Sequence, residues 1–193
     1  MGEIDYSDIA KTIVKTSLRV RPKEKVVIYG REDTLHLCEL IGIECCKIGA
    51  FPFISVRSDG YLLHRLLDTP LDSLKQTPLH ELSLVQNSDV IIVTHLQPED
   101  PSILDRVCEE RVSAEKLGFK QIAQMISPKF GKRWLFMDCP TAEQARVYGV
   151  DFKKYFRTFW RAVRVDHQKT YELAQRLRKT LREAKTVTIT SAR

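Results

Sequence analysis

The sequence predicts an α/β fold: an open, mainly parallel sheet with helices on both faces, in a Rossmann-like three-layer arrangement, and a helical C-terminal end. Short apolar, β-branched runs alternate at least four times with longer segments of helical periodicity. Parallel neighbouring strands need such long crossovers. No internal repeat, low-complexity stretch or linker interrupts the 193 residues, so we expect residues 1–193 to form a single domain.

The chain opens with a helix and a buried strand. Ile9, Ile13, Val14 and Ser17 repeat at the three-to-four spacing of an amphipathic helix. "KVVIYG" (25–30) follows, and this β-branched run ended by a glycine indicates a strand inside a sheet.

A second helix and a second strand come next. "TLHLCELIGIECCKIG" (34–49) has helical periodicity, and we expect Asp33 to cap its start and Gly49 to end it. "FPFISVR" (51–57) indicates a strand. Pro52 favours an edge position for it, because proline cannot donate a ladder hydrogen bond.

The middle of the chain predicts a short helix and the most apolar strand. "YLLHRLLD" (61–68) has the helical pattern, and Pro70 and Pro78 punctuate the loop after it. "DVIIVTHL" (89–96) is then a third strand.

Residues 100–128 predict one long helix. Asp100 is the expected cap, Pro101 occupies the first turn, and Pro128 closes the helix. "RWLFMD" (133–138) indicates the fourth strand.

The C-terminal part is mostly helical. Thr141 and Gln144 have the spacing of a capping box at the start of one helix. Two further helices are expected over 152–165 and 167–184. "TVTIT" (186–190) predicts a last strand, with 185–193 as the start of a strand leading into a second domain.

Charge and composition restrict the class of protein. The formal net charge is +6, but residues 151–193 hold 12 basic and 4 acidic residues and carry +8, so the rest of the chain carries −2. No apolar run approaches the roughly 20 residues that span a bilayer, and the charged start does not resemble a leader. The five cysteines have no CxxC spacing, which favours free thiols over a zinc site. We expect a cytoplasmic protein.

Motifs for nucleotide and metal chemistry are missing from the sequence. After the first strand, "YGREDT" has one glycine and two acids where a dinucleotide fingerprint needs G-x-G-x-x-G. There is no phosphate-loop motif, no G-x-S-x-G, and no pair of histidines at zinc-helix spacing. His95 follows a strand, where it is either part of a strand-end site or a hydrogen-bonded loop residue. We predict no catalytic and no metal-binding residue in this chain.

The carboxyl ends of the strands are the expected location of any ligand, as in other open parallel sheets. Here those ends carry "YGRED", "VRSDG", "THLQPED" and "MDCPT".

The segment 152–163 has two faces. Its aromatic residues and Val163 form a continuous stripe at helical spacing, which favours packing in the core over stacking on nucleic acid. The opposite side is a basic face that we expect to dock a partner protein: Lys154, Arg157, Arg161 and Arg164.

The ordered series of segments resembles one known family. "CPTAEQARVYGVDFKKYFRTFWRAVRVD" is similar to a stretch in the M29 family of metal-dependent aminopeptidases, the aminopeptidase T and aminopeptidase S group. In that family a Pro-Thr strand end leads into an alanine-rich helix and then an aromatic helix ending in Asp. The matching residues are Pro140, Thr141, Ala142, Ala145, Gly149, Tyr155, Phe159, Ala162 and Asp166. "AKTIVKTSLRVRPKEKVVIYG" resembles the family's opening element, with Lys23 where a glycine is usual, and "TVTITSAR" resembles the strand that leads into its second half.

The resemblance covers the family's N-terminal domain. It implies a leucyl-type aminopeptidase that removes N-terminal residues from peptides, with a pair of divalent metal ions held by Glu, His and Asp residues of a C-terminal domain that follows. This chain alone is then not catalytic and binds no cofactor. Its expected partners are peptide substrate in the full-length context, and either further copies in a homo-oligomer or a complementary C-terminal domain.

A second class of function stays open at this point. The basic C-terminal helices also suit a non-enzymatic binding module for nucleic acid or a protein partner. Nucleic acid is the less favoured ligand, because the aromatics and the cations lie on different sides of the helix. No membrane partner is expected.

Overall fold

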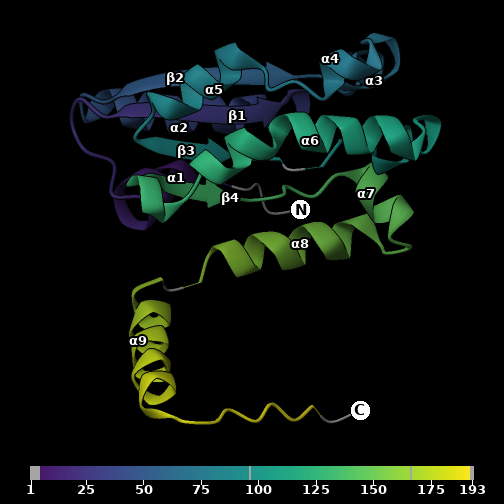
Figure 1. Ribbon diagram of the computed structural model, residues 1–193. Coiled ribbons are helices and arrows are strands. Elements are labelled where there is room, and N and C mark those ends of the chain that lie inside the picture. Colours follow the sequence, from purple (N-terminus) through teal and green to yellow (C-terminus); the bar gives the residue numbers. More distant parts are fainter. Residues whose placement is uncertain (1–4, 96, 166, 192–193) are drawn as a thin grey trace.

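Four parallel strands form a sheet at the centre of the molecule (Figure 1). The structure is a computed structural model that describes residues 5–95, 97–165 and 167–191. The strands are β1 (Lys25–Arg31), β2 (Phe51–Arg57), β3 (Val90–Val93) and β4 (Arg133–Phe136), in the order β2-β1-β3-β4. The predicted parallel sheet is confirmed, and Pro52 lies in an edge strand, opposite Val26.

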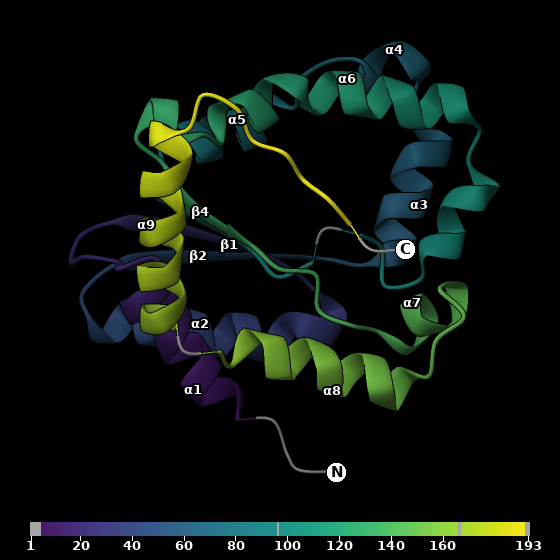
Figure 2. The same ribbon diagram turned by 90° about the horizontal axis from the view of Figure 1, so that it is seen from below.

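Helices cover both faces of this sheet, as the three-layer prediction requires. Figure 2 shows α5 and α6 on one face and α1, α2 and α8 on the other. The helices are α1 (Tyr6–Lys11), α2 (Leu35–Lys47), α3 (Asp59–Asp68), α4 (Leu71–Leu74), α5 (Leu79–Gln86), α6 (Glu109–Met125), α7 (Ala142–Val147), α8 (Phe152–Val163) and α9 (His167–Glu183). Helix α1 continues as a π-helix over Thr12–Ser17. Within the described residues, no helix is long and apolar enough to cross a membrane.

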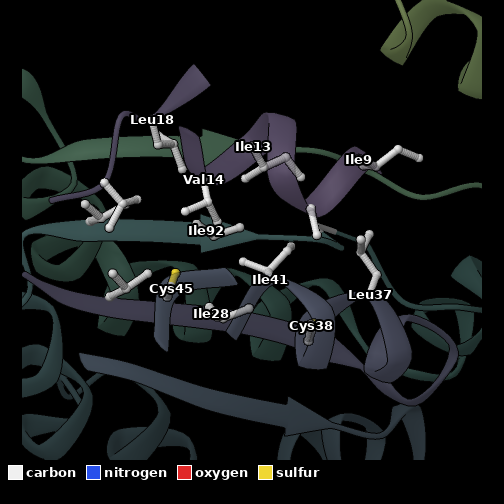
Figure 3. Packing of buried hydrophobic residues seen from close by; sticks show 14 of the residues in the cluster. Ile9, Ile13, Val14, Leu18, Ile28, Leu37, Cys38, Ile41, Cys45 and Ile92 are labelled. Carbon is white, nitrogen blue, oxygen red and sulfur yellow. The ribbon is translucent and has the colours of Figure 1, made fainter. Parts of the chain in front are cut away.

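The main core lies between the sheet and the layer of α1 and α2. Ile28 of β1 and Ile92 of β3 point to this side, because alternate residues of a strand face the same side. They meet Ile13 and Val14 from the first helical segment and Ile41 from α2 (Figure 3). All five of these side chains are buried, so this layer fixes the positions of β1 and β3.

The aromatic stripe of α8 joins this core, which confirms the packing role predicted for it. Trp160 is 3% exposed and makes edge-to-face contacts with Tyr6, 5.3 Å between ring centroids, and with Phe159 at 5.0 Å. Phe156 packs against the same cluster. Asp166, the last residue of the expected motif, lies outside the described residues.

Lys23 lies in the turn before β1 and has a positive φ of 69°. Its N–H donates to the carbonyl of Gly49 at 2.7 Å, which ties this turn to the end of α2. The left-handed conformation favours glycine, so a glycine would adopt this backbone with less strain than Lys23 does.

The predicted helix cap at Asp33 is wrong. A 3₁₀ turn, Glu32–Thr34, precedes α2, and the Thr34 hydroxyl accepts the N–H of Arg31 at 3.0 Å. The Asp33 carboxylate is instead directed to His95, 3.5 Å away. Helix α2 therefore starts from this turn without a side-chain cap, and Asp33 is part of the strand-end site described below.

The single long helix predicted over 100–128 is also wrong. A 3₁₀ helix, Pro101–Arg106, which Asp100 does cap, is followed by extended residues Val107 and Cys108, and α6 begins only at Glu109. Val107 is buried against Leu63 and Leu66 of α3. Burial of this β-branched side chain against α3 outweighs local helical propensity at the break.

The last strand, predicted over 186–190 and as the start of a longer strand over 185–193, is not observed. Residues 186–190 form no strand, and Val187 and Ile189 are 56% and 91% exposed. A strand requires a neighbour to hydrogen-bond with, and within the described part of the chain this segment pairs with none. Residues 192–193 lie outside the described residues.

Candidate functional site

The carboxyl ends of the parallel strands converge at one edge of the sheet, as expected. In the order β2-β1-β3-β4, the chain leaves β1 toward β2 and returns past β1 to place β3 on its other side. The gap between β1 and β3 is therefore a topological switch point, where open α/β sheets form a crevice for ligands. The tails of β1, β3 and β4 supply Asp33, His95 and Asp138 at this edge.

His95 is a buried cation between two carboxylates. Its Nδ1 lies 3.0 Å from Asp138 Oδ1, its Nε2 lies 3.5 Å from Asp33 Oδ2, and its side chain has no exposed surface. Each ring nitrogen therefore faces a carboxylate oxygen. Burial, the largest single influence, lowers the pKa of His95, but the two carboxylates outweigh it and raise the pKa to about 9. The imidazole is charged at neutral pH.

Arg31 and Asp59 form a further ion pair at this edge of the sheet. Arg31 Nη1 donates to Asp59 Oδ1 at 2.8 Å, and Arg31 Nε donates to the carbonyl of Gln97 at 2.9 Å. Asp59 also accepts the backbone N–H groups of Glu99 at 3.1 Å and Asp100 at 2.9 Å. These bonds hold the segment that follows β3 against the end of β1.

The Glu99 carboxyl has a raised pKa, in part because other acids lie near it. Burial raises the pKa of its carboxyl, and the neighbouring Asp33, Asp59 and Glu143 raise it further. Its carbonyl accepts the Thr141 hydroxyl at 2.7 Å, while Thr141 and Gln144 form the capping box predicted for α7. The start of α7 is therefore bonded directly to the segment after β3.

The thiols near the site are not nucleophiles. Burial raises the pKa of Cys38 and, more strongly, of Cys139, so both remain protonated at neutral pH. Cys38 Sγ lies 3.4 Å from the Thr94 hydroxyl, which cannot act as a strong base. The Cys–His pairing that activates a thiolate is not formed here.

A cavity of about 440 Å³ opens beside this edge on the side of α3, α5 and α6. Arg57 and Arg65 lie in its wall with Arg31, and each of the two is paired with an acid: Arg57 Nη2 donates to Glu81 Oε2 at 2.8 Å, and Arg65 contacts Glu115. Most of the wall is apolar and comes from the sheet, α3 and α6. Sequence reasoning missed these arginines, although Arg57 ends one predicted strand and Arg31 directly follows another.

The predicted basic face of α8 is where the sequence placed it. The side chains concerned are all exposed: Lys154, Arg157, Arg161 and Arg164. Three of them lie on α8, and Arg164 is its C-terminal cap. None of the four is among the residues that line the pocket formed by Asp33, Glu99 and the aromatic side of α8.

The site does not suit a metal ion. Both ring nitrogens of His95 face carboxylates and the ring is charged, so His95 offers no lone pair. Across the described ranges, no group of three or more His, Cys, Asp or Glu side chains is placed to hold a metal. The arrangement ties the segment after β3 to the end of β1 and to the start of α7.

Comparison with known proteins identifies the family. A family model described as thermophilic metalloprotease (M29) matches residues 3–189. A search of curated proteins found no match. Among solved structures, wild-type AmpT from Thermus thermophilus is similar with a TM-score of 0.64 and 16% sequence identity, over 82% of this chain and 42% of that chain. At this identity the likeness shows a shared fold, and this chain spans less than half the length of AmpT. The match over residues 3–189 shows that the chain belongs to the M29 family of metalloproteases.

Proposed function

We propose that this chain is the N-terminal half of a metal-dependent, leucyl-type aminopeptidase that removes N-terminal residues from peptides. The observation that carries the proposal is the M29 match over nearly the whole chain, together with the coverage of only 42% of the AmpT structure. The catalytic half would then be the part of the family that this chain does not cover.

In this proposal the residues of the chain shape the substrate chamber and dock a partner surface, and they do not catalyse hydrolysis. A divalent metal pair in such enzymes supplies an activated water and polarises the scissile carbonyl. The donors for such a pair would come from the other half, since His95 is already held between Asp33 and Asp138. The bonds from Arg31 and Asp59 to the segment after β3 give the strand-end edge a fixed shape. Such an edge suits the wall of a substrate chamber.

The partner-docking role of the α8 basic face belongs to the same proposal. Lys154, Arg157, Arg161 and Arg164 are exposed beside an apolar stripe that is already packed in the core. They would meet an acidic surface, either of the catalytic half or of another copy in a homo-oligomer. We also propose a cytoplasmic location, with neither membrane nor nucleic acid as a partner.

Purification from the native cell tests this proposal. The chain would be captured under mild conditions, identified by mass spectrometry, and assayed for metal content and for hydrolysis of leucine p-nitroanilide. We expect M29 metal-ligand residues either in the same polypeptide or in a tightly bound second chain, with activity in the same fraction. A fraction that contains only this chain and has neither metal nor aminopeptidase activity would refute the proposal.

A further inference from the structure

We propose that the cavity at the switch point binds a small organic anion, with a carboxylate held by Arg31 and Arg57 and an apolar body held between the sheet, α3 and α6. This inference does not depend on the function proposed above. It is argued from the position of the cavity, the arrangement of its cations and the character of its wall.

The two arginines stand side by side on adjacent strands. Arg31 of β1 and Arg57 of β2 are register partners in a parallel pair, so their side chains leave the same face of the sheet, with backbones about 4.8 Å apart. Both line the cavity. Each guanidinium group is a planar fork of donors that matches the two oxygens of a carboxylate, and here two such groups are neighbours.

The arginines keep donors that the protein does not use. Each guanidinium has five N–H donors. Among the described residues, Arg57 donates through Nη2 to Glu81, and Arg31 donates through Nε to Gln97 and through Nη1 to Asp59. Arg57 Nε and Nη1 and Arg31 Nη2 make no hydrogen bond within that part of the chain. These unused N–H groups are available to an anion while both ion pairs stay in place.

The balance of charge in the cavity wall also favours an anion. Arg31, Arg57, Arg65, Lys116 and the charged His95 line it, against the two carboxylates of Glu81 and Glu115. Asp59, Asp33 and Asp138, the acids that pair with Arg31 and His95, are not among the residues that line the cavity.

Tyr29 contributes its ring to the wall and not a donor. The Tyr29 hydroxyl has no contact with solvent, so a ligand in the cavity does not reach it. The ring lies beside Arg57, whose Cζ is 5.9 Å from the ring centroid, and this contact helps to hold the guanidinium in place.

The remaining wall selects the body of the ligand. Leu62, Leu66, Phe119 and Ile122 supply apolar surface from α3 and α6. A cavity of about 440 Å³ lies in the usual range for sites that enclose a small organic molecule, which are largely apolar with a few placed polar groups. A bare phosphate or sulfate would leave this surface uncovered, so a carboxylate with an aliphatic or aromatic chain fits best.

Calorimetric titration of the 193-residue chain with octanoate tests the proposal, with octylammonium and octanol as ligands of the same total carbon number. At physiological salt we expect saturable binding of octanoate with one site per chain, and at least tenfold weaker binding of the other two. Equal binding of octanoate and octylammonium, or no saturable octanoate binding below about 1 mM, would overturn it.

Two variants locate the binding. Arg57→Gln combined with Glu81→Gln removes a charge pair without leaving a buried carboxylate unpaired, and should weaken octanoate at least tenfold while octanol binding stays the same. Ser55→Phe fills the cavity from the β2 side without changing a charge, and should also weaken octanoate. The matched control is Arg178→Gln on α9, which should bind as the parent does. If both cavity variants bind octanoate like the parent, the site is elsewhere and the inference fails.

Discussion

Replacement of Trp160 by alanine removes the largest side chain from the core beneath α8. Trp160 is 3% exposed and contacts Tyr6, Phe156 and Phe159 through its ring. The chain offers a matched control, because its second tryptophan, Trp134, lies on β4 and is 44% exposed.

The cost follows from the buried area. A tryptophan buries roughly 200 Å², which at about 25 cal/mol per Å² gives an upper limit of about 5 kcal/mol. Measured losses for Trp→Ala in cores lie at about 3–5 kcal/mol, and we expect Trp160→Ala to fall in that range. Trp134→Ala should cost about 1–2 kcal/mol, because nearly half of that side chain remains in water.

Urea unfolding followed by far-ultraviolet circular dichroism measures both variants without using tryptophan fluorescence. In a separate thermal melt, the melting temperature of Trp160→Ala should fall by roughly 6–20 °C for a chain of this size. Trp160→Phe should lose much less, because the indole N–H makes no hydrogen bond within the described residues. A loss below about 1 kcal/mol for Trp160→Ala, or equal losses at both tryptophans, would refute the packing argument.

Three further predictions concern single positions. The pKa of His95 is raised in the fold, so its stabilising contribution is complete below about pH 6.5 and lost as pH rises through about 9. The free energy of unfolding of the parent in urea should fall by up to about 3 kcal/mol over that window, and His95→Asn should remove this dependence on pH. The same dependence in the variant would contradict the assignment. Lys23→Gly should raise the free energy of unfolding by about 0.5–1 kcal/mol, because glycine adopts the left-handed φ of 69° without strain. The control Lys11→Gly in α1 should lower the free energy of unfolding by about 1 kcal/mol. Thermal melts that rank the two variants the other way would exclude strain at Lys23. Gly118→Ala should cost about 1–3 kcal/mol in the same melts, because the added Cβ would collide with the Leu74 carbonyl oxygen at the end of α4 and would lie 2.8 Å from that of Gln76. The control is Gly60→Ala, where the atom nearest to the added Cβ is 3.8 Å away. Equal melting temperatures would show that α4 and α6 can separate at no cost.

Strong periodic patterns made most of the sheet and the helices predictable from sequence. The run Lys25–Gly30 and the proline at position 52 were enough to place a central and an edge strand. Errors arose where a distant contact decides the local structure. Val107 leaves the helical path because it packs against α3, and residues 186–190 lack the neighbour that a strand needs.

The candidate site was predictable only in its location. Parallel topology places ligands at the carboxyl ends of strands, and the polar tails there were visible in the sequence. The pairing of His95 with Asp33 and Asp138 joins three separate segments, and no local spacing encodes it. The same holds for Arg31 beside Arg57, since their adjacency depends on the register of β1 with β2.

Turnover by the purified chain tests the central claim most directly, namely that these 193 residues position and dock but do not catalyse. Leucine p-nitroanilide would be incubated with the chain and with Co²⁺, Zn²⁺ or Mn²⁺ in turn, beside the metal salt alone. The account predicts hydrolysis no faster than the metal salt gives. Robust turnover that a chelator abolishes and that follows the chain through a final gel-filtration step would contradict it.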